Sequence, residues 1–172
     1  MSCKNIKFDL VMGGPPCIGH STMGLKQGFD HSETKLFFEL VKIVASSKPR
    51  VVILENTPSI LKREQFAQVC KVFDSIGYDL CWSLVYAFEV GAPHNRRRWF
   101  CIAHNRYKDA GAVLNQLRRS LLARKESYTF AHWRKEPVPR MTAKKQVAFT
   151  KRSALLGNAV VPQQLRLAIF RI

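Results

Sequence analysis

The chain has 172 residues, of which 47% are hydrophobic and 10% aromatic, and its 28 lysines and arginines outnumber 12 aspartates and glutamates to give a formal net charge of +16. This length allows about one domain with a buried core, and this composition excludes an intrinsically disordered protein. No apolar run approaches the roughly 20 residues that cross a bilayer, and the N-terminus lacks a signal-peptide core, so we expect an intracellular protein without a membrane partner.

The cysteines carry no sign of a disulfide framework or of a metal site. They are odd in number and widely spread, with no Cys-x-x-Cys pair and no histidine at zinc-finger spacing. Most of them are therefore expected to be small buried apolar residues, and we expect no bound metal. The positions are Cys3, Cys17, Cys70, Cys81 and Cys101.

In the N-terminal part of the chain, short apolar runs alternate with longer amphipathic stretches. The run at 8–12 stops at Gly13-Gly14-Pro15-Pro16, which is typical of a buried strand that ends in a tight loop. A second buried run ends at Glu55-Asn56, and Pro49 and Gly77 end the two helical stretches. The pattern predicts strands over 8–12, 51–54, 80–87 and 98–103, and helices over 33–46 and 60–76.

The order of these elements predicts an α/β fold in which crossover helices join parallel strands. The last two strands are separated by about ten residues, too few for a helical crossover, so we expect them to pair antiparallel. In open α/β sheets, ligands bind outside the carboxyl ends of the strands. The 13–17 loop and Glu55-Asn56 both lie at such ends, so we expect the chemistry there.

Positive charge is concentrated in the C-terminal part of the chain. Between Arg106 and Arg152 there are thirteen basic and three acidic side chains, which favours nucleic acid as a partner. The alternative is a solvated basic surface with no such role. One amphipathic helix is predicted over 110–122 and a closing helix after Pro162. The aromatic residues of this tract either stack on bases or pack a small core, and they are Tyr107, Tyr128, Phe130 and Trp133.

A cysteine held at the end of a buried strand is the first candidate for a catalytic group. Pro15 and Pro16 restrict the backbone before Cys17, and Gly19 allows a ligand to approach closely. Cations or backbone N–H groups near the sulfur would stabilise the thiolate, which is the nucleophilic form. The alternative interpretation is a turn that contains a buried structural cysteine.

Residues 13–21 resemble the Pro-Cys loop of the DNA cytosine-C5 methyltransferases, whose usual form is Pro-Pro-Cys-Gln-Gly-Phe-Ser, although Ile18 and His20 replace the usual Gln and Phe. Further motifs follow in the order of that family, and together they carry the resemblance. These are Glu55-Asn56-Thr57, Gly91-Ala92-Pro93-His94-Asn95-Arg96-Arg97-Arg98, with His94 where the family usually has Gln, and Gly157-Asn158-Ala159-Val160-Val161-Pro162-Gln163.

The resemblance implies methyl transfer from S-adenosyl-L-methionine to C5 of a cytosine that is flipped out of double-stranded DNA. It assigns Cys17 to the attack on C6 and Glu55 to the proton at N3, which a carboxyl group buried at a strand end can supply in its protonated form. Arg96 and Arg98 match the arginines that hold the cytosine O2 and the nearby backbone, with ordinary phosphate or solvent contact as the alternative.

Other positions of the motifs match binding residues of the family, while His94 is interpreted as structural. Asn56 is expected to fix its loop beside the substrate. The resemblance implies that the cofactor is held by Pro15, Asn158 and Val160 and the substrate by Pro16, Asn56 and Ser21.

The resemblance covers most of residues 8–104 and about 153–172. It implies a partial Rossmann-like S-adenosylmethionine-dependent methyltransferase sheet with crossover helices and a small basic variable region. The family's Phe-x-Gly-x-Gly cofactor loop has no counterpart before Pro15, so a partner subunit could supply the cofactor-binding half. We divide the chain into a catalytic α/β portion over 1–104, a basic DNA-contact region over 105–152, and a segment over 153–172 that packs back on the catalytic portion.

The first interpretation is a catalytic segment of a methyltransferase, either a fragment or one half of a split enzyme. Two other interpretations remain. The chain is either an inactive relative that binds nucleic acid, or a protein that folds and acts only in an assembly. Retention of Cys17, Glu55, Arg96 and Arg98 together favours the enzyme, because a binding module does not need that set.

Overall fold

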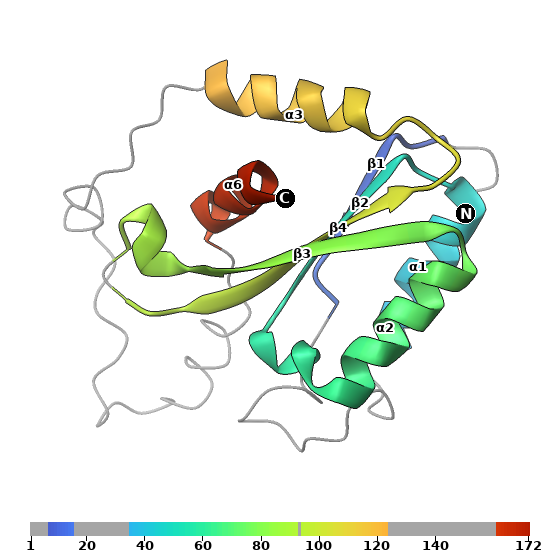
Figure 1. Ribbon diagram of the computed structural model, residues 1–172, viewed down its shortest axis with the longest axis horizontal. Coiled ribbons are helices and arrows are strands. Elements are labelled where there is room, and N and C mark those ends of the chain that lie inside the picture. The colour runs from blue at the N-terminus through green and yellow to red at the C-terminus, as the bar shows by residue number, and fades with distance from the viewer. Residues whose placement is uncertain (1–6, 16–34, 93, 124–160) are drawn as a thin grey trace.

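The computed structural model describes residues 7–15, 35–92, 94–123 and 161–172 (Figure 1). Within them a four-stranded sheet has the order β1-β2-β4-β3. The strands are β1 (Leu10–Gly13), β2 (Val51–Asn56), β3 (Tyr78–Tyr86) and β4 (Arg97–Asn105). The helices are α1 (Lys35–Ser47), α2 (Arg63–Ser75), α3 (Gly111–Ala123) and α6 (Pro162–Arg171), with short 3-10 helices η3 (Pro58–Leu61) and η4 (Ala87–Val90).

The sheet is mixed rather than parallel throughout. β1 and β2 are parallel, with Gly13 opposite Leu54, and the helical crossover predicted between them is confirmed. β4 pairs antiparallel with β3, as predicted, and also antiparallel with β2. The short η4 connection places β4 beside β3, and the other edge of β4 pairs with β2. β3 therefore runs parallel to β2 without being its neighbour.

The helix predicted over 60–76 is divided in the structure. Pro58 begins the 3-10 helix η3, and Lys62 then has an extended backbone, with φ −57° and ψ 135°, before α2 begins. Proline fits the first turn of a helix, and the extended residue after η3 turns the chain before α2 continues. The remaining elements lie within two residues of the prediction wherever their ends are described.

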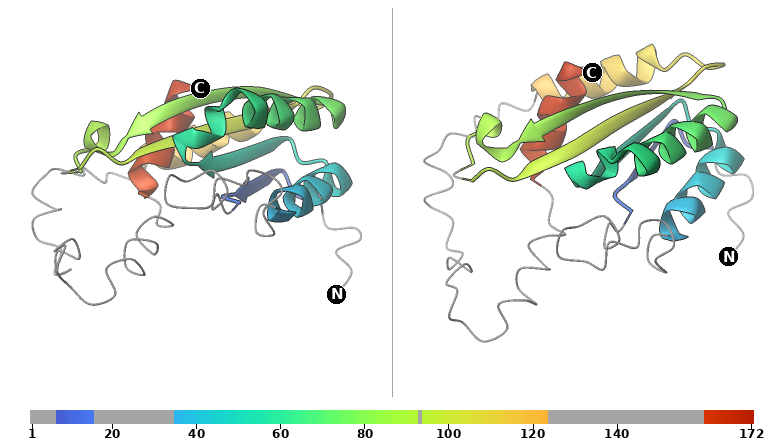
Figure 2. Two further views of the ribbon diagram at one scale, coloured as in Figure 1. Left: turned by 90° about the horizontal axis from the view of Figure 1, so that it is seen from below. Right: turned by 60° about the horizontal axis from the view of Figure 1, so that its bottom comes forward.

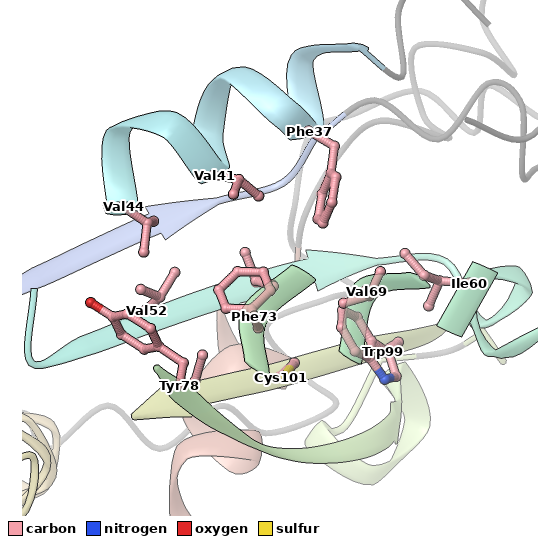
Figure 3. Packing of buried hydrophobic residues seen from close by; sticks show 12 residues of the cluster. Phe37, Val41, Val44, Val52, Ile60, Val69, Phe73, Tyr78, Trp99 and Cys101 are labelled. Atoms are coloured by element: carbon pink, nitrogen blue, oxygen red, sulfur yellow. The ribbon is translucent and has the colours of Figure 1, made fainter. Parts of the chain in front are cut away.

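One face of the sheet carries the main hydrophobic core (Figure 3). Alternate residues of β2 and β4 point to this face, where α1 and α2 cover them, because successive side chains of a strand point to opposite sides. Gly13 lies so close to α1 that a Cβ there would be 2.6 Å from Leu40 Cδ2. The buried members are Phe37, Val41, Val44, Val52, Leu54, Ile60, Val69, Phe73, Tyr78, Trp99, Cys101 and Ala103.

The opposite face is covered by α3 and α6. Figure 2 shows α1 and α2 together on one side of the sheet, with α3 across on the other. Val51, Ile53 and Ile102 pack here against Ile169 of α6, with half-buried leucines of α3 around them. Thus α3, which lies in the predicted basic region 105–152, packs on the sheet; the proposed division into 1–104, 105–152 and 153–172 stays a prediction.

Candidate active site

The ends of β1 and β2 lie side by side and bring the two expected loops together. Gly13 is opposite Leu54, and Gly14 follows directly beside Glu55. A Cβ at Gly14 would lie 3.2 Å from Glu55 Oε2, so glycine leaves the space into which this carboxylate reaches. The carboxyl group of Glu55 therefore contacts the loop that leads through Pro15 toward Cys17.

Glu55 forms an ion pair with Arg98 from the neighbouring strand β4. Arg98 Nε lies 2.9 Å from Glu55 Oε1, and the exposed fractions of the two side chains are 10% and 21%. Arg98 Nη1 also donates a hydrogen bond to the carbonyl oxygen of Arg97 at 2.9 Å. Loss of Glu55 would leave the largely buried Arg98 guanidinium without this partner, so the pair fixes the two side chains relative to each other.

The environment of Glu55 favours the protonated carboxyl group. Burial raises its pKa above the ordinary value, and the guanidinium groups of Arg98 and then Arg96 oppose that rise without cancelling it. A carboxyl group in this condition can keep or share a proton nearer neutral pH than an exposed glutamate can. This is the property that a proton donor at a developing anion requires.

Glu55 should therefore make stability fall as pH rises. Because its native pKa is raised, the folded protein holds a proton over a range where the unfolded chain has lost it. The stabilisation from Glu55 is fully present below the pKa that Glu55 has in the unfolded chain. It is lost as pH rises through the higher pKa that Glu55 has in the folded protein. The free energy of unfolding can be measured with urea at pH values across this range. Glu55→Gln should abolish its decrease with rising pH, whereas Glu39→Gln, at an exposed glutamate, should keep that decrease. Identical pH profiles for wild type and Glu55→Gln would contradict the assignment.

The hairpin between β3 and β4, which we call the arginine hairpin, carries Arg96 and Arg98, the two arginines to which the resemblance assigns roles. Its backbone closes where the Ala87 N–H donates to the Arg96 carbonyl at 2.8 Å, and Gly91 adopts a left-handed φ of 86° at the end of η4. The backbone N–H of Arg96 donates to His94 Nδ1 at 3.4 Å. Burial, followed by the charge of Arg96, lowers the pKa of His94. This geometry agrees with a structural role for His94.

Asn56 lies on the other side of β2 from Glu55. Its side chain is buried, and its Oδ1 accepts a hydrogen bond from the Thr57 backbone N–H at 2.8 Å. This bond holds the turn that leaves β2, as expected for a residue that fixes the loop. A direct contact between Asn56 and the substrate stays a prediction.

A cavity of about 180 Å³ lies between the sheet and α6, with the Glu55 carboxyl group in its wall. It is otherwise mostly apolar and lies where the loop after β1 begins. Its lining residues are Met12, Gly13, Gly14, Ile53, Glu55, Phe100 and Leu165. A bound group would therefore meet a mostly apolar surface and one carboxyl group that could orient it by a hydrogen bond.

Several of the predicted site residues lie outside the described residues, so their roles stay predictions. Among the predicted positions, the structure brings together Glu55 and Arg98 beside the Gly14-Pro15 loop. The residues outside are Cys17, Pro16, Ser21, Asn158 and Val160.

Sequence reasoning missed one residue next to the site. Gln164 of α6 is completely buried, and its side-chain amide contacts the backbone of the arginine hairpin. In the sequence, Gln164 differs from its surroundings only as a polar residue among the apolar positions of the predicted closing helix. A polar residue at such a position is not expected to be buried.

The described residues form neither a membrane span nor a metal site. None of the helices in this part of the chain has the length and apolar character that a bilayer span requires. Within the same ranges, no three His, Cys, Asp or Glu side chains are grouped so that they could hold a metal ion. The predicted intracellular location stays a prediction.

Comparison with known proteins places the chain in a family by its sequence. A family model described as C-5 cytosine-specific DNA methylase matches residues 2–147. The Type II methyltransferase M.CviJI of Paramecium bursaria Chlorella virus IL3A is 31% identical over 161 residues, which cover 94% of this chain and 41% of that protein. The Type II methyltransferase M.SsoII of Shigella sonnei is 30% identical over 103 residues, 58% of this chain and 27% of that protein.

Among solved structures, the S. pombe Dnmt2 methyltransferase is 18% identical and matches with a TM-score of 0.46 over 63% of this chain and 34% of that one. The chain thus spans about two fifths or less of the length of these relatives. The match of the family model over most of its length shows that the chain belongs to the C-5 cytosine-specific DNA methylase family.

Proposed function

We propose that this chain is the cytosine-attacking portion of a DNA (cytosine-5)-methyltransferase. It would act on a cytosine of double-stranded DNA, with S-adenosylmethionine as the methyl donor. The observation that supports this most directly is the Glu55 carboxyl group, which has a raised pKa, is bonded to Arg98, and lies against Gly14 in the loop that leads to Cys17.

The proposed chemistry begins with the thiolate of Cys17. Its sulfur forms a bond to C6 of the cytosine, and the electrons of the C5–C6 double bond move toward C5 and N3. Glu55 gives its proton to N3, which neutralises the charge that develops on the ring. C5 is then nucleophilic enough to form a bond to carbon. Loss of the C5 proton to a base and departure of the thiolate from C6 restore the C5–C6 double bond, and N3 returns its proton to the Glu55 carboxylate.

Arg98 and Arg96 would act on both reacting groups. Their positive charges favour the anionic form of a nearby thiolate and can hold the cytosine O2. Arg98 also holds Glu55 through the 2.9 Å contact, which orients the carboxyl group within the cavity wall. Removal of either charge should therefore disturb the attack and the protonation together.

The residues present fit only part of a cofactor site. S-adenosylmethionine supplies an electrophilic methyl group when it is bound. The cavity of about 180 Å³ beside Gly14 and Glu55 is smaller than the roughly 300 Å³ at which pockets for whole small molecules begin. The cavity suits one end of the cofactor or the reacting edge of the base. We propose that Pro15, Asn158 and Val160 of this chain contact the cofactor.

We propose that the remainder of the cofactor site comes from another segment, either a longer form of this polypeptide or a partner subunit. The supporting fact is that M.CviJI, which matches nearly all of this chain, is more than twice as long as the matched part. The net charge of +16 supports phosphate contacts along the DNA. Since the two curated relatives described above are Type II methyltransferases, we propose that methylation here serves restriction–modification.

The test uses two reactions that separate attack from methyl transfer. Attack at C6 lets C5 exchange its hydrogen with water, so a duplex with tritium at cytosine C5 should release tritium even without the methyl donor. With S-adenosylmethionine, a duplex that contains 5-fluorocytosine should stay covalently bound, because fluorine cannot leave as a cation. Cys17→Ala should abolish both signals, whereas Cys81→Ala, at an exposed cysteine, should abolish neither.

Each outcome distinguishes the candidate functions. Exchange without trapping would support Cys17 as the nucleophile and would favour the proposal that another segment supplies the rest of the cofactor site. DNA binding that is sensitive to salt, with neither exchange nor trapping, would overturn the catalytic proposal and favour a nucleic-acid-binding relative. The assay uses duplexes of many sequence contexts, so that its outcome does not depend on one recognition sequence.

A further inference from the structure

Gln164 joins α6 to the arginine hairpin through its side-chain amide. Its Nε2 donates one hydrogen bond to the Val85 carbonyl at 2.8 Å and another to the Arg96 carbonyl at 2.9 Å. Val85 lies on β3 before the turn and Arg96 directly precedes β4 after it. A single amide group therefore connects the two sides of the hairpin at the place where its turn begins and ends.

These two contacts lie next to the ion pair of the active site. Val85 is directly opposite Arg98 in the β3–β4 ladder, and Arg96 is two residues before it. Arg98 in turn bonds to Glu55, so the path from Gln164 to the carboxyl group passes through one short piece of backbone and one side chain. A shift of the hairpin by a few tenths of an ångström would change the Arg98–Glu55 distance directly.

Gln164 has no packing advantage over an apolar residue. The side chain is 0% exposed on a helix whose Ala168 and Ile169 pack in the core. Its Oε1 has no hydrogen-bond partner among the described residues. Burial of an amide costs free energy unless it is fully bonded, so leucine or methionine would suit a purely structural position better. The two donated bonds are what this side chain adds.

We propose that Gln164 is a positioning residue for the methyltransferase reaction, which holds the β3–β4 hairpin so that Arg98 lies against Glu55. This rests on the proposed function for its relevance to catalysis, but the geometric claim can be tested without DNA. Gln164 lies in the first turn of α6, shortly after Asn158 and Val160, the proposed cofactor contacts.

The experiment compares Gln164→Met with wild type by following the Glu55 carboxyl carbon in a ¹³C NMR titration of the full chain. Methionine matches the length of glutamine but donates no hydrogen bond. If the hairpin loosens, Arg98 lowers the pKa of Glu55 less, so the titration midpoint should move upward by about half a pH unit or more. The neighbouring Gln163→Met should leave the midpoint at the wild-type value.

A second control lowers the stability of the protein at a site far from the turn between β3 and β4. Tyr78 donates a hydrogen bond from its hydroxyl to the Pro49 carbonyl at 2.6 Å, at the opposite end of β3. Tyr78→Phe should lower the thermal midpoint and leave the Glu55 titration unchanged, which separates positioning from a general loss of stability. A folded Gln164→Met with the wild-type Glu55 midpoint would overturn the proposal.

If Gln164→Met does not fold, the wild-type protein still tests the claim. The two Nε2 hydrogens of Gln164 should exchange slowly with water and show couplings through hydrogen bonds to the Val85 and Arg96 carbonyl carbons. Exchange as fast as that of an exposed glutamine would overturn the proposal. These readouts need neither DNA nor cofactor, so their failure is distinct from failure of the Cys17 trapping experiment. In the catalytic assay, Gln164→Met should lower kcat for tritium release about tenfold, because small misplacements of catalytic groups slow the reaction, and should leave KM for DNA unchanged.

Discussion

Glu55→Gln is expected to slow tritium release from cytosine C5 by about 10²–10⁴-fold, the usual contribution of a positioned acid–base group. Glutamine keeps the shape of the side chain and can still accept the hydrogen bond from Arg98 Nε. It cannot deliver a proton to N3, so charge would remain on the ring as the sulfur adds to C6. Under the proposed function the loss should appear in kcat, because Glu55 carries no positive charge that could bind phosphate.

The measurement is the tritium-release rate at saturating DNA for wild type and Glu55→Gln, without methyl donor. Glu89→Gln is the matched control, because Glu89 also pairs with an arginine, with Arg171 Nη2 2.7 Å away, but lies outside the cavity. The control should retain the wild-type rate within about twofold. A rate for Glu55→Gln within about threefold of wild type, which is well below a typical acid–base contribution, would remove Glu55 from the proposed proton transfer.

Phe73→Ala is expected to lower the free energy of unfolding by about 3–5 kcal/mol. Phe73 is 0% exposed in the main core, where its ring centroid lies 6.4 Å from that of Phe37 and 6.1 Å from that of Tyr78 (Figure 3). Truncation removes contacts between α2, α1 and β3 at one point. The surrounding residues come from different elements, so the space cannot close without moving a helix.

Urea unfolding followed by circular dichroism measures this loss. Phe88→Ala is the control, because the Phe88 side chain is 53% exposed and its removal should cost under about 1 kcal/mol. Total stabilities of domains are only about 5–15 kcal/mol, so Phe73→Ala should be close to unfolding at 37 °C. A loss for Phe73→Ala no larger than for Phe88→Ala would contradict the packing of α2 on this face.

The local elements could be predicted from the sequence because their signals are local. Apolar residues at helical spacing predicted α1, α3 and α6, and short apolar runs stopped by Gly13 and by Glu55-Asn56 predicted β1 and β2. The antiparallel β3–β4 pair followed from the length of its connection. The break at Lys62 was missed, because apolar periodicity continues through it although the backbone does not.

Strand order could not be predicted in this way. Placement of β4 between β2 and β3 depends on which edges remain available after the helices pack, and no local pattern records that choice. The site depends on it, because β4 next to β2 is what brings Arg98 within 2.9 Å of Glu55. The four motifs indicated that these residues belong to one site, but not which of them would touch.

By itself, the sequence determined the element types, the family resemblance, and the candidate set of Cys17, Glu55, Arg96 and Arg98, because residue identity and short-range spacing carry that information. Only the tertiary structure decided the raised pKa of Glu55, the cavity beside it and the contacts of Gln164 with the hairpin. Burial, charge proximity and hydrogen-bond partners arise between residues far apart in the chain. They come into existence only when the sheet and its covering helices have packed.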